Sequence, residues 1–204
     1  MFPKATLTLA AVLAVVFAFQ SVMPGITDAF LLDSTQAGRE PWTLVTSMFL
    51  HGSLLHLGSN LFSLFIFGLV AESLIGTRRF ILVYVASGLV ASVASLFFYD
   101  ASLGASGAIF GIIGFLAIVR PRLIVPAFGV PLPILAAAAL WIVLSFAGLF
   151  SPGEIAYAAH LGGMAAGAAI GGIVRKEYRE ERAHRRRPVS DKEINEWEEQ
   201  YMKE

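Results

Sequence analysis

The 204-residue sequence contains no cysteine and few charged residues. Without cysteine the chain can form no disulfide framework, and chemistry that needs a thiolate is excluded. Only 15% of the residues are charged, whereas 56% are hydrophobic and the mean hydropathy is +0.71. A soluble domain of this length has no use for so much apolar surface, so the composition is that of a membrane protein.

Long apolar segments occupy most of the chain. There are six, over residues 5–23, 54–75, 80–98, 106–119, 132–150 and 155–174. Most approach the ~20 residues that a helix needs to cross ~30 Å of hydrocarbon, and an open sheet could not satisfy its backbone in lipid. The sequence therefore predicts an all-α membrane protein, with a bundle of six transmembrane helices over residues 1–174. A cleaved signal peptide is the alternative for the first segment, but Pro24 follows it without a small-residue cleavage site.

The few charged residues are unevenly distributed. If the N-terminus is cytoplasmic, all but one of the 15 Lys and Arg residues lie on the cytoplasmic side, and Arg39 is the exception. Cytoplasmic loops are enriched in Lys and Arg, so we expect both termini in the cytoplasm. Residues 175–204 would form a charged cytoplasmic tail whose basic first half meets anionic membrane lipids. Nucleic-acid binding by the basic run 185–187 is disfavoured, because no aromatic platform or recognition fold accompanies it.

The first outside connection, residues 24–52, is long and has apolar content of its own. Connections longer than ~12–15 residues usually carry function or local structure. Its apolar residues include Trp42, and tryptophan is enriched where a membrane meets water. We therefore expect this connection to lie partly in the membrane interface.

Polar side chains from three different segments are expected at one depth in the membrane. At a rise of 1.5 Å per helical residue, Ser106, His160 and Asn60 lie ~21, ~22 and ~24 Å above the cytoplasmic ends of their segments. In a ~30 Å hydrocarbon core, all three are near the outer leaflet. His56 is one helical turn from Asn60 on the same face. Polar groups inside a membrane are costly and usually mark function, so this level is the predicted site.

A serine and a histidine are the predicted reactive pair at this level. Ser106 begins the shortest segment between Gly104 and Gly107, where a helix N-terminus presents unpaired N–H groups that can stabilise an oxyanion. His160 is followed by Gly163 and Gly167, a spacing that allows close approach of a partner helix.

Two other chemistries could use such a polar cluster, and the sequence disfavours the first and excludes the second. A metal site formed by His51, His56 and His160 is one alternative, although no carboxylate and no H-E-x-x-H motif accompanies these histidines. Aspartyl proteolysis is excluded because the six apolar segments contain no aspartate.

The polar residues occur in four ordered blocks between Trp42 and about Gly167. They are His51-Gly-Ser-Leu-Leu-His56-x-x-x-Asn60, Gly68-x-x-x-Glu72 followed by Gly76, Gly104-Ala-Ser106-Gly, and Ala159-His160-x-x-Gly163-x-x-x-Gly167. A Gly-x-Ser-x-Gly-like string alone is weak evidence, whereas four blocks in order on correctly spaced segments are specific. This order resembles the rhomboid family of intramembrane serine proteases. One departure is Thr43, which follows Trp42 where the family often has arginine.

The resemblance assigns roles to the residues of the site. It implies that Ser106 is the nucleophile and that His160 is its general base and acid, without a metal or cofactor. It also implies that His56 and Asn60 form the oxyanion hole together with the Ser106 backbone N–H. Both side chains can donate hydrogen bonds, as an oxyanion requires.

Three supporting residues follow from the same resemblance. Gly104 belongs to the serine motif. Phe110 occupies the position of an aromatic residue that stacks on the histidine in the family. Glu72 is expected to anchor neighbouring helices or loop backbone.

The resemblance implies an intramembrane serine endopeptidase that cleaves single-span membrane proteins near the outer leaflet through an acyl-enzyme. One alternative is a catalytically silent relative that binds transmembrane clients, which the retained Ser106 and His160 disfavour. Another is a channel or transporter, which the lack of an inverted repeat or of a charged path across the membrane disfavours. The brevity of the chain favours a prokaryotic plasma membrane, with an organelle membrane as the alternative.

Overall fold

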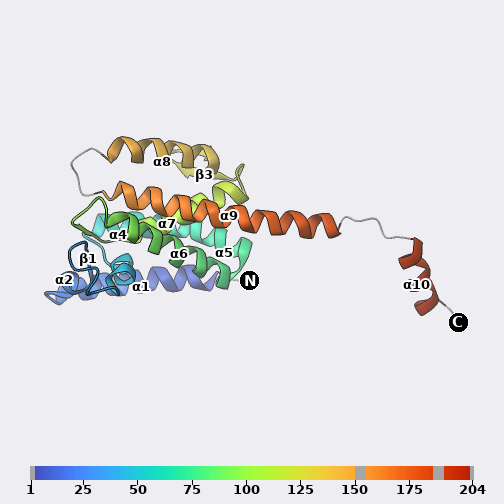
Figure 1. Ribbon diagram of the computed structural model, residues 1–204, viewed down its shortest axis with the longest axis horizontal. Helices are drawn as coiled ribbons and strands as arrows, with labels where there is room; N and C mark the ends of the chain where they lie inside the picture. Colours follow the sequence, from blue (N-terminus) through green and yellow to red (C-terminus); the bar gives the residue numbers. More distant parts are fainter. Residues whose placement is uncertain (1–2, 150–154, 186–190, 203–204) are drawn as a thin grey trace. The chain divides into compact units, whose positions relative to one another are not determined.

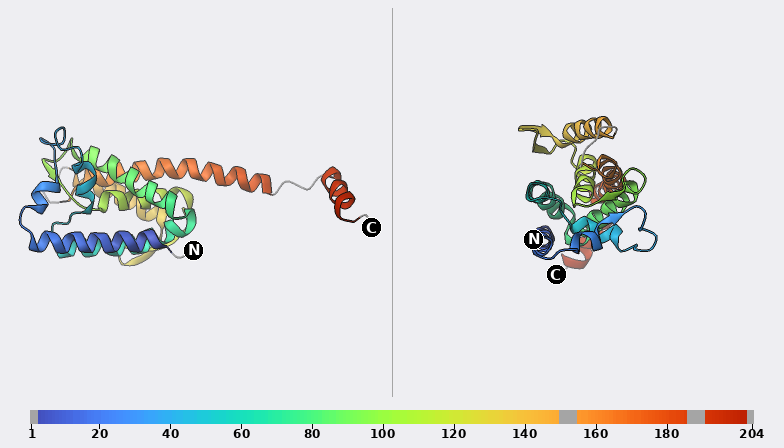
Figure 2. Two further views of the ribbon diagram at one scale, coloured as in Figure 1. Left: turned by 90° about the horizontal axis from the view of Figure 1, so that it is seen from below. Right: turned by 90° about the vertical axis from the view of Figure 1, so that its left-hand side faces the viewer.

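The computed structural model describes residues 3–149, 155–185 and 191–202, and most of these residues are helical. The chain divides into two compact units, Met1–Gly172 and Ile173–Glu204. The first unit is a bundle of apolar helices, with α1 and α8 at opposite edges (Figures 1 and 2). The second unit contains the C-terminal part of α9 (Tyr157–Arg185) and the helix α10 (Asp191–Tyr201).

Four helical stretches are long and apolar enough to cross a membrane. They are α1 (Lys4–Val22), the continuous stretch Leu54–Ile75, α6 (Thr77–Ser95) and the part Tyr157–Lys176 of α9. Two further apolar helices are shorter, namely α7 (Ser106–Val119) and α8 (Ile134–Gly148). These helices fall on the six apolar segments of the sequence. The count of six membrane spans stays a prediction, because length and composition support only four within the described residues.

The stretch Leu54–Ile75 is helical throughout but not uniform. It consists of α4 (Leu54–Ser63), the π-helical turn η2 (Leu64–Gly68) and α5 (Leu69–Ile75). The Ser53 hydroxyl caps α4 by accepting a hydrogen bond from the His56 N–H at 3.1 Å. Gly76 then separates α5 from α6 with a φ of 78°, a backbone conformation that glycine adopts without a steric penalty.

The connections contain short elements that the sequence analysis did not predict. Residues 24–52 hold α2 (Ile26–Phe30), β1 (Leu32–Asp33), α3 (Thr43–Thr46) and the 3₁₀ turn η1 (Ser47–Phe49). β1 pairs antiparallel with β2 (Ala101–Ser102), which lies just before α7. Between α7 and α8, β3 (Ile124–Ala127) and β4 (Val130–Pro133) form a hairpin. The fold is therefore mostly helical, with two small antiparallel pairs.

Glu72 is a buried charged side chain that joins three helices. Only 3% of it is exposed. Its carboxylate accepts hydrogen bonds from the backbone N–H groups of Ala5 and Thr6 at 2.9 and 2.8 Å. It also accepts from the hydroxyls of Thr6 at 2.8 Å and Thr77 at 2.6 Å. Because the first N–H groups of a helix have no partner within that helix, Glu72 of α5 satisfies the start of α1 while holding α6.

Replacing Glu72 by alanine is expected to destabilise the bundle. The change leaves three buried donors and one half-buried donor without their acceptor, so we expect a loss of about 3 kcal/mol in the free energy of unfolding. Unfolding in detergent micelles measures this loss, and Glu72→Gln, which keeps one acceptor oxygen, should be intermediate. Ser73→Ala is the control, because the Ser73 hydroxyl bonds only to Leu69 in its own helix. Equal stability of Glu72→Ala and Ser73→Ala would contradict the anchoring role.

Candidate active site

Ser106 and His160 lie within hydrogen-bond distance although 54 residues separate them in the chain. The Oγ atom of Ser106 and the Nε2 atom of His160 are 2.9 Å apart. Ser106 is the first residue of α7, and His160 lies in the first turn of α9. An imidazole nitrogen at this distance can accept the proton of the hydroxyl and so make the oxygen nucleophilic.

Glycines bring the backbones of α7 and α9 together. A Cβ atom at Gly163 would overlap the carbonyl oxygen of Gly107, and one at Gly167 would overlap that of Gly111. Gly107 and Gly111 also pack closely against α6, where added Cβ atoms would overlap Ala91 and Ser87. α7 is therefore held between two helices with no large side chain in between. This spacing lets the short side chain of Ser106 reach the imidazole of a neighbouring helix.

Aromatic rings fix the plane of the His160 imidazole. The ring of Phe110, one turn after Ser106, stacks on it with a centroid distance of 4.1 Å and an interplanar angle of 6°. Tyr157 meets the imidazole edge-on at 6.3 Å. Trp141 of α8 in turn meets Phe110 edge-on at 5.9 Å. Stacking limits the rotation of the imidazole and keeps Nε2 directed at Ser106.

The His56 ring lies against Gly104 beside Ser106. An added Cβ at Gly104 would be 2.8 Å from Cε1 and 2.9 Å from Nε2 of His56, and 3.9 Å from Ser106 Oγ. Gly104 also has a φ of 125°, which a side chain would oppose. The N–H of Gly52 donates to His56 Nδ1 at 3.4 Å. In the neutral ring this contact assigns the proton to Nε2, the nitrogen on the side of Gly104.

Asn60 is buried one turn after His56. It is 4% exposed, and its Nδ2 donates to the His56 carbonyl oxygen at 2.9 Å. A side-chain amide nitrogen carries two hydrogens, so one donor remains for a further acceptor.

His51 is the third histidine at this end of the bundle. It is 2% exposed, and its ring meets that of His56 edge-on with centroids 5.1 Å apart. Burial, and to a lesser degree the neighbouring His56, lowers the pKa of His51 to about 4, so its imidazole is neutral at physiological pH. In the described parts of the chain, no group of three or more His, Asp or Glu residues is arranged to hold a metal ion.

Gln20 of α1 holds the backbone of His51, a contact that the sequence analysis missed. Its Oε1 accepts from the His51 N–H at 3.0 Å, and its Nε2 donates to the His51 carbonyl oxygen at 3.3 Å. The same Nε2 donates to the Thr27 hydroxyl at 2.9 Å. A lone amide side chain near the end of an apolar segment was the available signal, because such a group needs partners inside a membrane.

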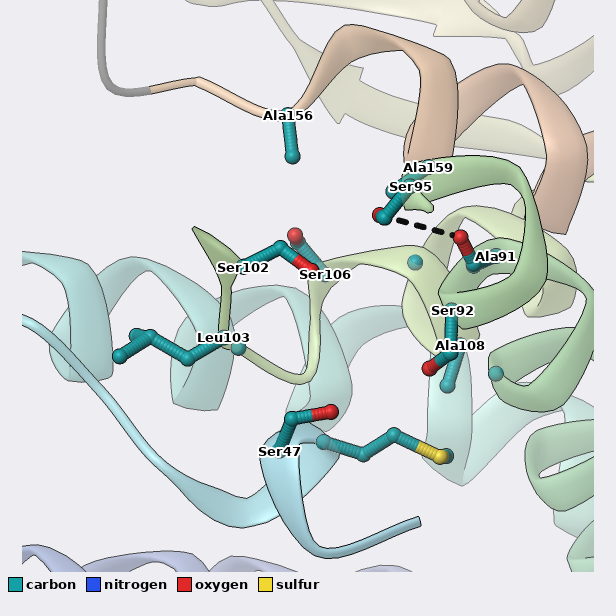
Figure 3. Close-up of a pocket in the computed structure, with 14 residues that line it drawn as sticks. Ser47, Ala91, Ser92, Ser95, Ser102, Leu103, Ser106, Ala108, Ala156 and Ala159 are labelled. Atoms are coloured by element: carbon teal, nitrogen blue, oxygen red, sulfur yellow. Dashed lines mark hydrogen bonds between the residues drawn. The ribbon is translucent and has the colours of Figure 1, made fainter. Parts of the chain in front are cut away.

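A pocket lined by small side chains opens beside Ser106 (Figure 3). Its polar wall consists of the hydroxyl residues Ser47, Ser92, Ser95 and Ser102. Most of its other lining residues are glycine or alanine. Ser92 and Ser95 donate to the carbonyl oxygens of Leu44 and Ala91 at 2.8 and 3.1 Å. The pocket has a volume of about 20 Å³, so it has room beside the nucleophile for a small group only.

Comparison with known proteins identifies the class of protein and then its family. The family model described as Rhomboid domain matches residues 38–177. This match and the apolar helices together show that the chain is an integral membrane protein. The chain belongs to the rhomboid family, whose members are generally intramembrane serine proteases.

Individual relatives match over different lengths. Rhomboid protease GluP of Bacillus subtilis is 32% identical over 139 residues, which cover 66% of this chain and 26% of that protein. Rhomboid protein 1, mitochondrial, of Saccharomyces cerevisiae is 30% identical over 158 residues, covering 70% and 44%. RHOMBOID-like protein 6, mitochondrial, of Arabidopsis thaliana is 42% identical over 79 residues, covering 38% and 26%. The chain thus spans less than half the length of each of these relatives.

The glycine contact between α7 and α9 predicts a difference between two alanine variants of α9. Gly163→Ala forces the helices apart, so we expect a loss of about 2 kcal/mol in the free energy of unfolding. Gly172→Ala is the matched control because nothing lies within 4 Å of its added Cβ. Alanine favours helix over glycine, so this variant should be equally or slightly more stable. Unfolding in one detergent compares them, and equal losses would contradict the close contact.

Proposed function

We propose that this protein is an intramembrane serine endopeptidase in which Ser106 is the nucleophile and His160 the general base. The observation that carries the proposal is the 2.9 Å contact between Ser106 Oγ and His160 Nε2. The stacked Phe110 ring orients the imidazole toward the hydroxyl. Nucleophile, base and an orienting group are the parts that covalent catalysis by serine needs.

The reaction would proceed through an acyl-enzyme. The Ser106 hydroxyl gives its proton to His160 Nε2 as Oγ bonds to the substrate carbonyl carbon, whose oxygen becomes an oxyanion. The resulting imidazolium gives that proton to the leaving amine as the peptide C–N bond breaks. Water then attacks the ester, with His160 as base again, and releases the new carboxyl terminus and Ser106.

The space beside Gly104 suits the oxyanion of this reaction. His56 Nε2 and Ser106 Oγ both lie within 4 Å of the point that a side chain at Gly104 would occupy. A hydrogen-bond donor therefore lies close to the nucleophile, as the oxyanion formed by attack of Ser106 requires. The remaining N–H of Asn60 and the Ser106 N–H at the start of α7 would supply further donors. We assign the oxyanion hole to these three groups.

The substrates would be transmembrane segments of single-span proteins, partly unwound near the outer leaflet. The six apolar helices would span the membrane with both termini cytoplasmic, which places Ser106 ~21 Å above the cytoplasmic end of its helix. The small pocket beside Ser106 favours a small residue at the cleavage site. We place the protein in a prokaryotic plasma membrane, and the mitochondrial names of two relatives make an organelle membrane the alternative.

Removing either member of the pair should abolish proteolysis. We expect Ser106→Ala and His160→Ala to cleave a reporter transmembrane substrate at least ~10³-fold more slowly than wild type. A fluorophosphonate probe should label wild type and the control Ser73→Ala, but not Ser106→Ala. Cleavage that persists in both dyad variants would refute the proposal that Ser106 and His160 carry out proteolysis. A wild-type protein that captures the substrate without cleaving or labelling would instead be the catalytically silent relative.

Gly104→Ala tests the position of the His56 donor beside Ser106. Its methyl group would lie 2.8 Å from the His56 ring, so we expect reporter cleavage to fall by ~10²-fold or more, as when an oxyanion donor is lost. Gly25→Ala is the matched control. Gly25 also has a positive φ, of 86°, but nothing lies within 4 Å of its added Cβ. Similar cleavage by the two variants would contradict the assignment of His56 to the oxyanion.

A further inference from the structure

The first turn of α9, which carries His160, is capped by a tyrosine from a distant part of the chain. The hydroxyl oxygen of Tyr99 accepts a hydrogen bond from the Ala158 N–H at 3.0 Å, although 59 residues separate them. Tyr99 lies between α6 and β2, in the connection that leads to Ser106. Ala158 lies two residues before His160. No pattern in the sequence indicates this contact.

The cap is needed because the described residues just before α9 supply none. The first N–H groups of a helix have no partner within it and are usually satisfied by a Ser, Thr, Asp or Asn side chain just before the helix. α9 is preceded by Ile155 and Ala156, whose side chains hold no acceptor. Ala158 is only 5% exposed, so its N–H depends on an acceptor within the protein. Tyr99 provides that acceptor.

The connection that holds Tyr99 also determines where Ser106 lies. After Tyr99 the chain forms β2, which pairs with β1. The N–H of Gly104 then donates to the Ser47 carbonyl oxygen at 2.9 Å, and α7 begins two residues later with Ser106. Residues 99–106 are thus fixed at several points, and through Tyr99 they are bonded to the turn that carries His160.

We propose that Tyr99 is a positioning residue for the Ser106–His160 pair. On one side of His160, Gly163 fixes α9 against Gly107 of α7. On the other side, the Tyr99 hydroxyl fixes the helix start against the connection before Ser106. The imidazole is held between these two attachments. Loss of the Tyr99 hydrogen bond lets Nε2 move away from Oγ. This inference rests on the proposed function and adds to it a residue that does not touch the substrate.

Tyr99→Phe removes only the hydroxyl, and Tyr84→Phe is the matched control. Tyr84 of α6 is 1% exposed, and its buried hydroxyl has no hydrogen-bond partner within the described residues. For Tyr99→Phe we expect kcat for the reporter substrate to fall about fivefold with KM unchanged, the effect of losing one hydrogen bond. The rate constant for fluorophosphonate labelling of Ser106 should fall by the same factor, while the final labelled fraction stays that of wild type. Tyr84→Phe should match wild type in all four measurements.

Each other result contradicts the positioning role in a recognisable way. Wild-type kcat and labelling rate in Tyr99→Phe would show that the hydroxyl does not act on the pair. A higher KM alone would assign Tyr99 to substrate binding, and a lower labelled fraction with an unchanged rate constant would assign it to folding. If wild type itself neither cleaves nor labels, the proposed function fails first, and this inference fails with it.

Discussion

The contact between the backbones of α7 and α9 is the constraint on which the site depends. Apolar side chains drive little association between helices in lipid, since lipid tails are equally apolar, so close packing and hydrogen bonds must hold such helices together. Gly107 and Gly111 of α7 face Gly163 and Gly167 of α9 at a distance that leaves no room for a Cβ. Serine has one of the shortest side chains among the nucleophilic residues. Only at this helix separation does its Oγ come within 2.9 Å of His160.

Buried polar groups fix the rest of the bundle around this contact. Near the start of α1, Glu72 accepts from the N–H groups of Ala5 and Thr6. Near its end, Gln20 bonds to both backbone polar groups of His51. Polar groups in hydrocarbon must find partners within the protein, so each of these side chains specifies one position of α1. α1 contributes no residue to the reactive pair, yet its end holds the segment that leads into His56.

The parts of the fold that were predictable depend on local patterns. Apolar length located the helices, and the helical rise predicts one membrane depth for Ser106, His160 and Asn60. The short pair β1–β2 and the contacts of Gln20 and Tyr99 were not predictable in the same way. Gln20 and Tyr99 bond to backbone groups 31 and 59 residues away. No periodicity or composition indicates which distant N–H a side chain will reach, because that depends on how the helices pack.

The sequence by itself determined that the chain is a membrane protein and which polar residues lie inside its apolar segments, because hydropathy and helical rise are local properties. Its motifs also indicated the rhomboid family. The tertiary structure decided which of these residues meet. It placed Ser106 Oγ against His160 Nε2, set the His56 ring against Gly104 beside the serine, and attached Tyr99 to the first turn of α9. Depth alone allows many lateral arrangements of six helices, and the positions of glycines and buried hydrogen bonds select one of them.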